Sequence, residues 1–278
     1  MHNNQWLALE TSTDTLSLAV ARGTQTWTHT SAGGALTSTH MIPQTLALLK
    51  EAGLALTDLQ AVVFGRGPGA FTGLRTACSV AQGFAFGADL SVLPIDTLLA
   101  VAEEARVASV APVTRVLTVM DARMEQVYVA AYEFTPNAAD VTPPNADDTN
   151  QMQGTWRCVQ APELHSPESL HWPAEWSQDS FIAAGNAWPV YAGRWPAALT
   201  APQVTALPTA AALLRLAPAA WAAGAAVPPE EALPLYIRDK VAQTTDERMQ
   251  IKAQQAAHAA ELAQVNEAAK TASSTITP

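Results

Sequence analysis

Short apolar runs alternate with amphipathic segments over the first part of the chain. Runs rich in small and β-branched apolar residues predict strands, and these lie at residues 5–10, 15–22, 25–30, 61–65 and 91–95. Apolar positions at helical spacing predict helices, and these lie at residues 36–52, 74–86 and 97–107. Pro43 falls inside the first helix, which either begins near Pro43 or is kinked there. A strand meander followed by alternating helices and strands is typical of an α/β lobe.

The same pattern begins again in the middle of the chain. Strands are predicted at 115–121 and 125–134, separated by a short turn. Glu10 and Asp121 each end the first strand of their half, and each is followed four residues later by another acid. This repetition predicts two related α/β lobes that face each other. The expected domains are a first lobe at 1–108, a second, degenerate lobe at 109–240 and an Ala-rich tail at 241–278.

The rest of the second lobe is less regular. Pro, Asn and Asp residues without apolar periodicity predict an exposed loop at 135–155. A strand is expected at 180–185, surrounded by Trp residues that predict local packing. A helix at 208–224 is expected to be broken or bent at Pro218. The tail has helix propensity but little to bury, so we expect a loose helix or disorder, with docking onto another surface as the alternative.

Composition narrows the classes of function. The formal net charge of −10 repels the phosphates of RNA, so we expect this chain to meet RNA only through a basic partner protein. Cys78 and Cys158 are too few for a disulfide framework, and both are expected to be reduced and buried in a cytoplasmic protein. No two His residues stand four apart and no CxxC or HExxH motif occurs, so no metal site is predicted. Neither a signal peptide nor a membrane span is predicted.

The segment GRGPGAFTG at residues 65–73 is the strongest candidate for ligand binding. It joins a predicted strand to a predicted helix, and backbone N–H groups at a helix N-terminus can cradle a phosphate. It lacks the Lys-Ser/Thr end of a P-loop and does not match G-x-G-x-x-G. The alternative is a tight turn in which the glycines permit positive φ. The residues predicted to contact a nucleotide or phosphate are Glu10, Thr11, Ser12, Gly67, Gly69 and Gly73.

Charged side chains beside these turns are further candidates for chemistry. Glu10 and Asp121 are placed to hold a metal-bound nucleotide or to act as general acid and base, and the alternative is that each caps a turn. Arg66, Arg75 and Arg123 are placed to clamp an anion, or else are solvated or paired structurally. No G-x-S-x-G motif occurs, so nucleophilic hydrolysis is not predicted.

The predicted helix at 74–86 carries small residues on several faces, among them Ala77, Cys78, Ala81 and Gly83. Small side chains let another helix approach closely, which suits either a core or a subunit interface. Residue types alone do not separate these two roles.

Three stretches together resemble the TsaB family, also called YeaZ. They are LALETSTDTLSLAVARG, FGRGPGAFTGLRTACSVAQGFAFGADL and VLTVMDARMEQVYVAAY. The most specific part is the run Gly-Arg-Gly-Pro-Gly-x-Phe-Thr-Gly-x-Arg, and LPLYIRDKVA at 233–242 is similar to the family's closing segment. The resemblance is firm over 7–132 and weak over 135–207, and the chain beyond residue 243 resembles an addition to the family's usual length.

The resemblance implies an actin-like fold of the sugar kinase/Hsp70/actin superfamily, with two ribonuclease-H-like lobes. It also implies a cytoplasmic bacterial complex in which this chain is a non-catalytic partner or activator of the catalytic paralogue TsaD, together with the ATPase TsaE. That complex transfers a threonylcarbamoyl group to N6 of the adenosine adjacent to the anticodon in tRNA. ATP and a metal ion are then expected in the partner subunits and no cofactor in this chain. The tRNA is reached only through the complex, a homodimer is the alternative assembly, and no membrane is involved.

The family's dimer interface is formed by the first two helices of the first lobe. Carried over by resemblance, the expected interface residues are His40, Leu46, Leu49, Arg75, Cys78, Ala81, Gln82 and Gly83. The catalytic paralogue carries a His-x-x-x-His metal pair, and Asp96 and Ala100 stand at the matching positions, which supports a non-catalytic role. Many relatives have Asp where this chain has Glu10, and the longer side chain argues against a nucleotide contact there. The alternative function is a stand-alone enzyme of the same superfamily, either a metal-dependent transferase, a glycoprotease-like hydrolase or a small-molecule kinase.

Overall fold

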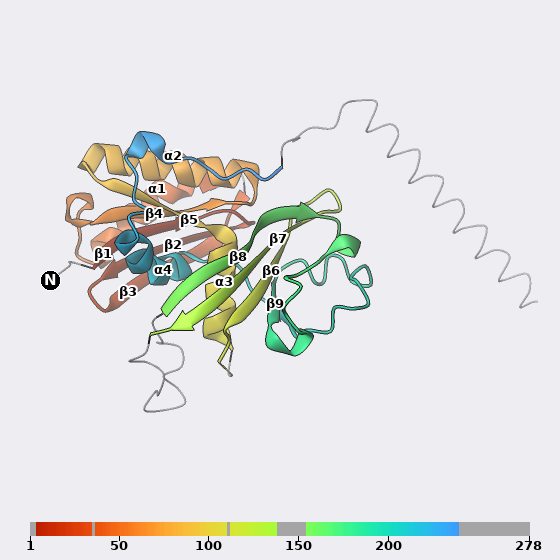
Figure 1. The fold of residues 1–278 in the computed structure, drawn as a ribbon. Coiled ribbons are helices and arrows are strands. Elements are labelled where there is room, and N and C mark those ends of the chain that lie inside the picture. The colour runs from red at the N-terminus through yellow and green to blue at the C-terminus, as the bar shows by residue number, and fades with distance from the viewer. Residues whose placement is uncertain (1–3, 35–36, 110–111, 138–153, 239–278) are drawn as a thin grey trace, which may run out of the picture. The chain divides into compact units, whose positions relative to one another are not determined.

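The computed structural model describes residues 4–34, 37–109, 112–137 and 154–238. The tail predicted at 241–278 and most of the loop predicted at 135–155 lie outside these residues. Contacts between residues group Met1–Ile237 into one compact unit, and the boundary that we expect between two lobes near residue 108 stays a prediction. The described strands form two five-stranded sheets, which confirms the α/β class (Figure 1).

The first sheet has the strand order β3-β2-β1-β4-β5. Its strands are β1 (Gln5–Glu10), β2 (Thr15–Arg22), β3 (Gln25–Ala32), β4 (Ala61–Gly67) and β5 (Ser91–Asp96). The central strand β1 pairs antiparallel with β2 and parallel with β4. The helices of this part of the chain are α1 (Thr37–Glu51), α2 (Phe71–Ala88) and α3 (Thr97–Ala108), with a short 3-10 turn, η2, at Leu56–Asp58.

The second sheet repeats the first, strand for strand. Its strands are β6 (Arg115–Asp121), β7 (Val127–Pro136), β8 (Gly154–His165), β9 (Ile182–Gly185) and β10 (Gln203–Thr205). The order β8-β7-β6-β9-β10 matches the first sheet, and β6 pairs antiparallel with β7 and parallel with β9. Glu10 and Asp121 both end the central strand of their sheet, so the duplication predicted from these two acids is confirmed.

Helices cover both faces of the first sheet. Alternate residues of β1 point to opposite faces: Leu7 and Leu9 pack with α1 and α2, whereas Trp6 and Ala8 pack with α4 (Ala210–Ala222). In Figure 1, α1 and α2 lie together along one side of the sheet and α4 lies on the other side. The helix α3 contacts β6, β7 and β9 as well as β4 and β5, so it joins the two sheets.

The outer face of the second sheet carries no α-helix among the described residues. It is covered by turns, including the 3-10 turns η5 (Pro167–Ser169) and η6 (Gln178–Ser180), and by large aromatic side chains. The buried aromatic residues there are Trp176, Phe181, Trp188 and Tyr191. The local packing predicted from the Trp residues is therefore confirmed.

Two features differ from the sequence pattern. The strand β8 lies where no element was predicted, because its residues alternate between half-buried and exposed without a clear apolar face, and its pairing with β7 shifts register. Of the break or bend expected at Pro218, the break is absent, since α4 runs through it to Ala222. Proline fixes φ near the helical value and removes one N–H, which a packed helix can tolerate. Similarly, α1 begins at Thr37 and includes Pro43.

The two cysteines differ in their surroundings. Cys78 is buried on α2, as expected, whereas Cys158 on β8 is exposed, and both are free. The expectation that Cys158 is buried is wrong because β8 lies at the edge of its sheet.

Candidate functional site

The turn after β1 packs directly on the glycine-rich loop between β4 and α2. Glu10 is buried, and its Oε1 accepts a hydrogen bond from the Ser12 N–H at 2.6 Å. Thr11 Oγ1 donates to the Gly73 carbonyl at 2.8 Å, and the Ala70 N–H donates to the Ser12 carbonyl at 2.7 Å. The structure therefore brings most of the predicted nucleotide-contact residues together.

The glycines of this loop face protein atoms. A Cβ added at Gly69 would lie 2.5 Å from the Ser12 Cβ, and one at Gly73 would lie 1.9 Å from the Thr11 carbonyl oxygen. Gly67 has a φ of +115° and faces the Leu235 carbonyl instead. Close packing on the turn after β1 explains Gly69 and Gly73, whereas the positive φ of the alternative considered from the sequence is found only at Gly67. Nucleotide or phosphate contact at this loop stays a prediction that their packing does not favour.

Glu10 sits against the same loop with little solvent around it. A Cβ added at Gly65 would lie 1.8 Å from Glu10 Oε2, an atom that has no hydrogen-bond partner among the described residues. Burial raises the pKa of Glu10, and hydrogen bonds from Ser12 and Thr11 oppose that rise. The carboxylate is oriented by its own turn, which is the structural alternative predicted for it.

Asp121 occupies the corresponding position in the second sheet. Its Oδ1 accepts from the Arg123 N–H at 2.8 Å, so both strand-end acids cap the N–H two residues further on. The same oxygen accepts from the Tyr191 hydroxyl at 2.8 Å. Burial, together with this bond to Asp121, raises the pKa of Tyr191 to about 12. Turn capping therefore accounts for both acids.

The turn between β6 and β7 connects the two halves of the repeat. Arg123, Met124 and Glu125 all have positive φ, at 60°, 54° and 62°, a region that costs non-glycine residues conformational energy. Arg123 bonds to Asp14 on the first turn at 2.8 Å and to Asp121 on its own turn at 3.2 Å. The guanidinium thus bridges acids of the two turns.

The other arginines considered as anion clamps are also paired. Arg66 Nε donates to Asp96 Oδ1 at 2.5 Å. Arg75 Nε donates to the Tyr236 hydroxyl at 3.0 Å, and its guanidinium lies 3.9 Å from the centroid of the Phe71 ring. Structural pairing, the alternative stated from the sequence, explains all three arginines.

The segment 229–237, here called the closing segment, packs along α2. It begins with the 3-10 turn η7 (Pro229–Glu231). The Ala232 carbonyl accepts from Cys78 Sγ at 3.2 Å and from Gln82 Nε2 at 3.0 Å, and the Leu235 N–H donates to the Arg66 carbonyl at 2.7 Å. The polar groups of α2 that were predicted to meet a partner thus bind this segment of the same chain.

Three of the predicted interface residues lie in the core of the chain. Leu49, Cys78 and Ala81 are only 2%, 4% and 0% exposed. Helical periodicity places them on the stripes of α1 and α2 that face the first sheet, so no partner can reach them while the helices stay packed. His40, Leu46, Arg75 and Gly83 are exposed and Gln82 is half-buried, and their contact with a partner stays a prediction.

Large apolar side chains stand on the outer surface of α1 and α2. Ile42 and Leu46 of α1 are 44% and 48% exposed, and Phe86 of α2 is 78% exposed. Gly83 and Gly87 are exposed beside Phe86, and a Cβ added at either would meet nothing within 4 Å. We call the exposed residues Ile42, Leu46, Gly83, Phe86 and Gly87 the α1–α2 face. Contiguous exposed apolar side chains mark protein contacts, and glycines allow close helix approach.

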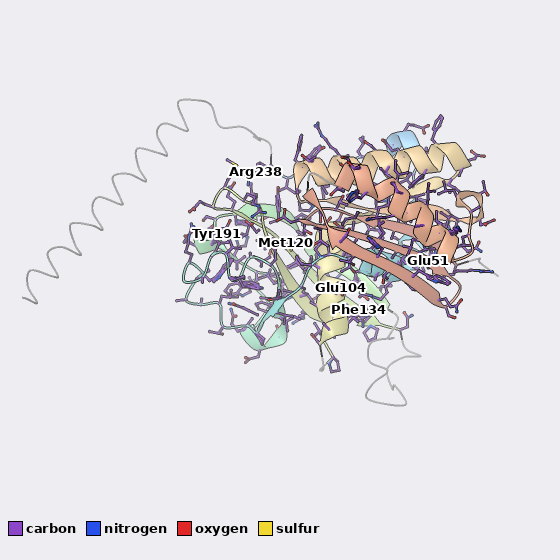
Figure 2. All side chains as sticks on the ribbon, turned by 180° about the vertical axis from the view of Figure 1, so that it is seen from behind. Glu51, Glu104, Met120, Phe134, Tyr191 and Arg238 are labelled. Atoms are coloured by element: carbon purple, nitrogen blue, oxygen red, sulfur yellow. The ribbon has the colours of Figure 1, made fainter. Side chains whose placement is uncertain are left out.

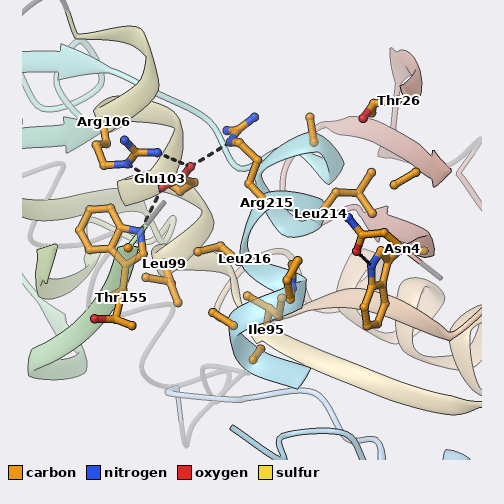
Figure 3. Close-up of a pocket in the computed structure, with 18 of the residues that line it drawn as sticks. Asn4, Thr26, Ile95, Leu99, Glu103, Arg106, Thr155, Leu214, Arg215 and Leu216 are labelled. Atoms are coloured by element: carbon orange, nitrogen blue, oxygen red, sulfur yellow. Dashed lines mark hydrogen bonds and ion pairs between the residues drawn. The ribbon is translucent and has the colours of Figure 1, made fainter. Parts of the chain in front are cut away.

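A pocket of about 810 Å³ lies between α3, α4 and the ends of β1 and β8 (Figure 3). Glu103 accepts hydrogen bonds there from Arg106 at 2.9 Å, from Arg215 at 2.9 Å and from the Trp156 Nε1 at 3.1 Å. Burial acts to raise the pKa of Glu103, but the two arginines outweigh it and the pKa is lowered. These charged groups neutralise one another, which favours a structural link between elements.

The neighbours of Glu103 extend this link. Glu104 accepts from Arg215 at 2.7 Å and from the Thr209 hydroxyl at 2.6 Å. The Arg106 guanidinium lies 4.4 Å from the centroid of the Phe134 ring, and Figure 2 labels Glu104 and Phe134 where α3 meets the second sheet. The sequence analysis missed this cluster, although Glu103 and Arg106 at i, i+3 on a predicted helix were a visible signal.

The exposed side chains of the α1–α2 face were also only partly found. Ile42, Phe86 and Gly87 were not predicted as contacts, although their apolar or small side chains fall off the buried stripe of each helix. As a separate finding, none of the described helices combines the length and apolarity that crossing a membrane requires.

Two sheets of identical strand order, each with a strand-end acid capping the turn after its central strand, define the actin-like, ribonuclease-H-like class of protein. A family model described as TsaD, tRNA N6-adenosine threonylcarbamoyltransferase, matches residues 24–272. The chain is 30% identical over 238 residues to the tRNA threonylcarbamoyladenosine biosynthesis protein TsaB of Escherichia coli (strain K12), covering 85% of this chain and 95% of the relative. It is 33% identical to the TsaB of Haemophilus influenzae over 242 residues, covering 87% and 96%.

A solved structure named YeaZ from Pseudomonas aeruginosa matches in three dimensions as well. Its TM-score is 0.71 at 35% identity, with 84% of this chain and 99% of that chain covered. The chain therefore belongs to the TsaB (YeaZ) family.

Proposed function

We propose that this chain is a non-catalytic partner subunit in the biosynthesis of threonylcarbamoyladenosine in tRNA. It activates a TsaD-type catalytic paralogue that transfers a threonylcarbamoyl group to N6 of the adenosine adjacent to the anticodon. Relatives of nearly full coverage are named for this biosynthesis. The observation that carries the partner role is the α1–α2 face, where Ile42 and Leu46 of α1 and Phe86 of α2 are exposed and two glycines of α2 are open.

Two residues of this chain stand where the resemblance places the metal-binding histidines of the catalytic paralogue, and both support a non-catalytic role. Asp96, at the first position, accepts a hydrogen bond from Arg66 at 2.5 Å. Ala100, at the second position, offers no ligand atom and is fully buried in the core. Glu10 and Asp121 cap their turns. ATP and a metal ion accordingly act in the partner subunits, and this chain supplies no cofactor to the transfer reaction.

The assembly follows from the same surface. The catalytic paralogue binds the α1–α2 face through a matching pair of helices, and a homodimer of this chain uses that face when the paralogue is absent. TsaE and the tRNA join through the complex, because a chain with a net charge of −10 does not attract RNA by itself. The complex works in the cytoplasm.

The test is to place a charge at Gly83. Gly83→Arg fills space that no described atom occupies, so the fold is expected to persist while the helix approach is blocked. We expect the Kd for the cognate catalytic paralogue to rise about 100-fold, since an unpaired charge is desolvated in an interface, and reconstituted tRNA modification to fall with it. The control is Thr28→Arg on the exposed surface of β3, which should change neither.

Equal binding and modification by Gly83→Arg would reject the α1–α2 face as the docking surface. Modification that proceeds fully without this chain would reject the activator role itself. Turnover of ATP, a peptide or a small-molecule phosphate acceptor by the purified chain alone would instead support the stand-alone enzyme.

A further inference from the structure

We propose that Glu163, His165 and His171 form a binding site for a divalent transition metal ion, with Zn²⁺ the best match. The three residues lie at the end of β8 and in the loop that follows it, on the second sheet. This site is separate from the α1–α2 face and does not depend on the proposed function. It contains none of the residues on which the proposed role in tRNA modification rests.

The backbone places the three ligands together. Glu163 and His165 are two residues apart on β8, and side chains at this spacing share one face of a strand. The chain then turns through η5, Pro167–Ser169, and brings His171 back beside them. The rings of His165 and His171 meet edge to face, with their centroids 4.5 Å apart.

The distances between ligand atoms fit one small cation. His165 Nε2 lies 2.9 Å and His171 Nε2 lies 3.8 Å from Glu163 Oε2, and all three ligand atoms lie within 4.8 Å of one another. A tetrahedral zinc ion with ligand bonds of about 2.0–2.2 Å separates its ligand atoms by roughly 3.3–3.6 Å. Small side-chain rotations therefore bring the three atoms to zinc-binding positions.

A hydrogen bond behind His171 orients its ring for metal binding. Its Nδ1 lies 3.3 Å from the Ser169 carbonyl oxygen, which accepts a proton and cannot donate one. With the hydrogen on Nδ1, the Nε2 of the neutral ring directs its lone pair to the side of the Glu163 carboxylate. A metal ion or a second proton on the ring satisfies this pair, and the metal site uses the neutral ring. Outer hydrogen bonds to a backbone carbonyl orient ligating histidines in the same way in known metal sites.

The donor set selects the class of ion. Two imidazole nitrogens and one carboxylate oxygen match the open three-ligand zinc sites, in which water takes the fourth position. Mg²⁺ and Ca²⁺ prefer oxygen ligands alone, so neither is expected to compete. Solvent reaches the site, because the side chains of His171 and Glu163 are 57% and 48% exposed and that of His165 is 16% exposed.

The prediction from sequence that this chain has no metal site rested on the absence of His residues four apart and of the CxxC and HExxH motifs. Here a strand supplies Glu-x-His and a loop supplies the third ligand. The fold therefore brings together three ligands whose spacing matches none of those motifs in the sequence. A bound ion would fix the loop 166–171 to β8.

The experiment titrates the chelator-treated full chain with Zn²⁺ by calorimetry, and with Co²⁺ by visible absorption. We expect one ion per chain, an absorption band typical of tetrahedral cobalt, and a rise in Tm on addition of zinc. His171→Ala should weaken zinc binding at least about 10-fold and abolish the cobalt band. His40→Ala, which removes an exposed histidine on α1, should leave binding unchanged.

Glu163→Gln tests the carboxylate without removing a ring, and should weaken zinc binding while the circular dichroism spectrum is retained. The proposal is overturned if the wild-type chain binds no zinc, or if His171→Ala and Glu163→Gln bind it as tightly as wild type. It is also overturned if His2→Ala alone abolishes binding, because the N-terminal histidine would then be the site. Mg²⁺ should produce no heat of binding, and competition by Mg²⁺ would contradict the assigned donor chemistry.

Discussion

The outer faces of the two sheets are built differently, although the sheets themselves repeat strand for strand. The first is covered by α1 and α2, which leave Ile42, Leu46 and Phe86 exposed. The second is covered by turns and by Trp176, Phe181 and Trp188, which bury one another. The two sheets therefore share their strand order but not the elements that cover their outer faces.

The difference shows how one repeated core serves two purposes. The aromatic residues that cover the second sheet pack on it and bond to it within the same chain. For example, Trp176 Nε1 donates a hydrogen bond to Glu133 at 3.2 Å. The helical cover buries one stripe of each helix and leaves Ile42, Leu46 and Phe86 exposed. The second sheet is thus closed by its own chain, and the first carries the surface that we propose for a partner protein.

The largest effect is expected where the second sheet closes on itself. Trp176→Ala removes a side chain that is 3% exposed and packs on Phe181, so it should lower the free energy of unfolding by about 3–5 kcal/mol. Phe86→Ala on the other outer face removes a side chain that is 78% exposed, and should change that free energy by less than about 0.5 kcal/mol. Urea unfolding of both variants measures the contrast. Equal losses would show that the two covers do not differ.

A somewhat smaller loss of stability is expected when the Glu103 cluster, which links elements packed on both sheets, is changed. Glu103→Gln leaves Arg106 without its carboxylate and Arg215 with Glu104 alone, and should lower the free energy of unfolding by about 3 kcal/mol at pH 7. Because the pKa of Glu103 is lowered in the folded protein from its usual 4.5, its stabilisation is present above that value. It is lost as the pH falls through the lower folded pKa.

The measurement for Glu103 is urea unfolding of wild type and variant at each pH from 7 down to the acid limit of folding. Glu10 acts in the opposite direction, since its raised pKa makes the protein more stable as the pH falls through that value. Only the difference between wild type and variant therefore isolates Glu103. A difference that stays constant below pH 4.5 would contradict the assigned shift.

The smallest effect concerns the open glycine of the α1–α2 face. Gly83→Ala adds a methyl group that meets nothing within 4 Å and restricts the unfolded chain, so it should raise the free energy of unfolding by about 0.5–1 kcal/mol. The control is Gly53→Ala, which should be destabilising because Gly53 has a φ of +67°. Thermal unfolding of both variants is sufficient. A loss of stability in Gly83→Ala would show that the glycine serves the fold of the monomer.

The sequence predicted those parts of the fold that have strong local patterns. The repeat was visible because Glu10 and Asp121 end similar strands, and periodicity located α2 within a few residues. The strand β8 escaped because an edge strand with two half-exposed faces has no clean alternation. The burial of Ala81 escaped because the small residues of α2 give little contrast between its faces, and Leu49 of α1 was placed at the interface by the family resemblance and not by its helical position.

The candidate sites depend on contacts between distant segments, which local patterns do not encode. Glu103 meets Arg215 of α4, and His171 meets Glu163 across a turn. Such pairs become visible only once the sheets are assembled. The turn-capping role of Glu10 was foreseen as an alternative, because a carboxylate and an N–H two residues apart need no distant partner.

The closing segment places a constraint on the timing of synthesis. Cys78 and Gln82 on α2 reach their shared acceptor only at Ala232, and Arg75 reaches Tyr236. A ribosome that adds about 5–20 residues per second needs roughly 10–30 s to travel from one to the other. During that interval the side of α2 that later carries the closing segment is bare. A partner that requires the finished surface therefore engages only chains whose translation has passed Tyr236.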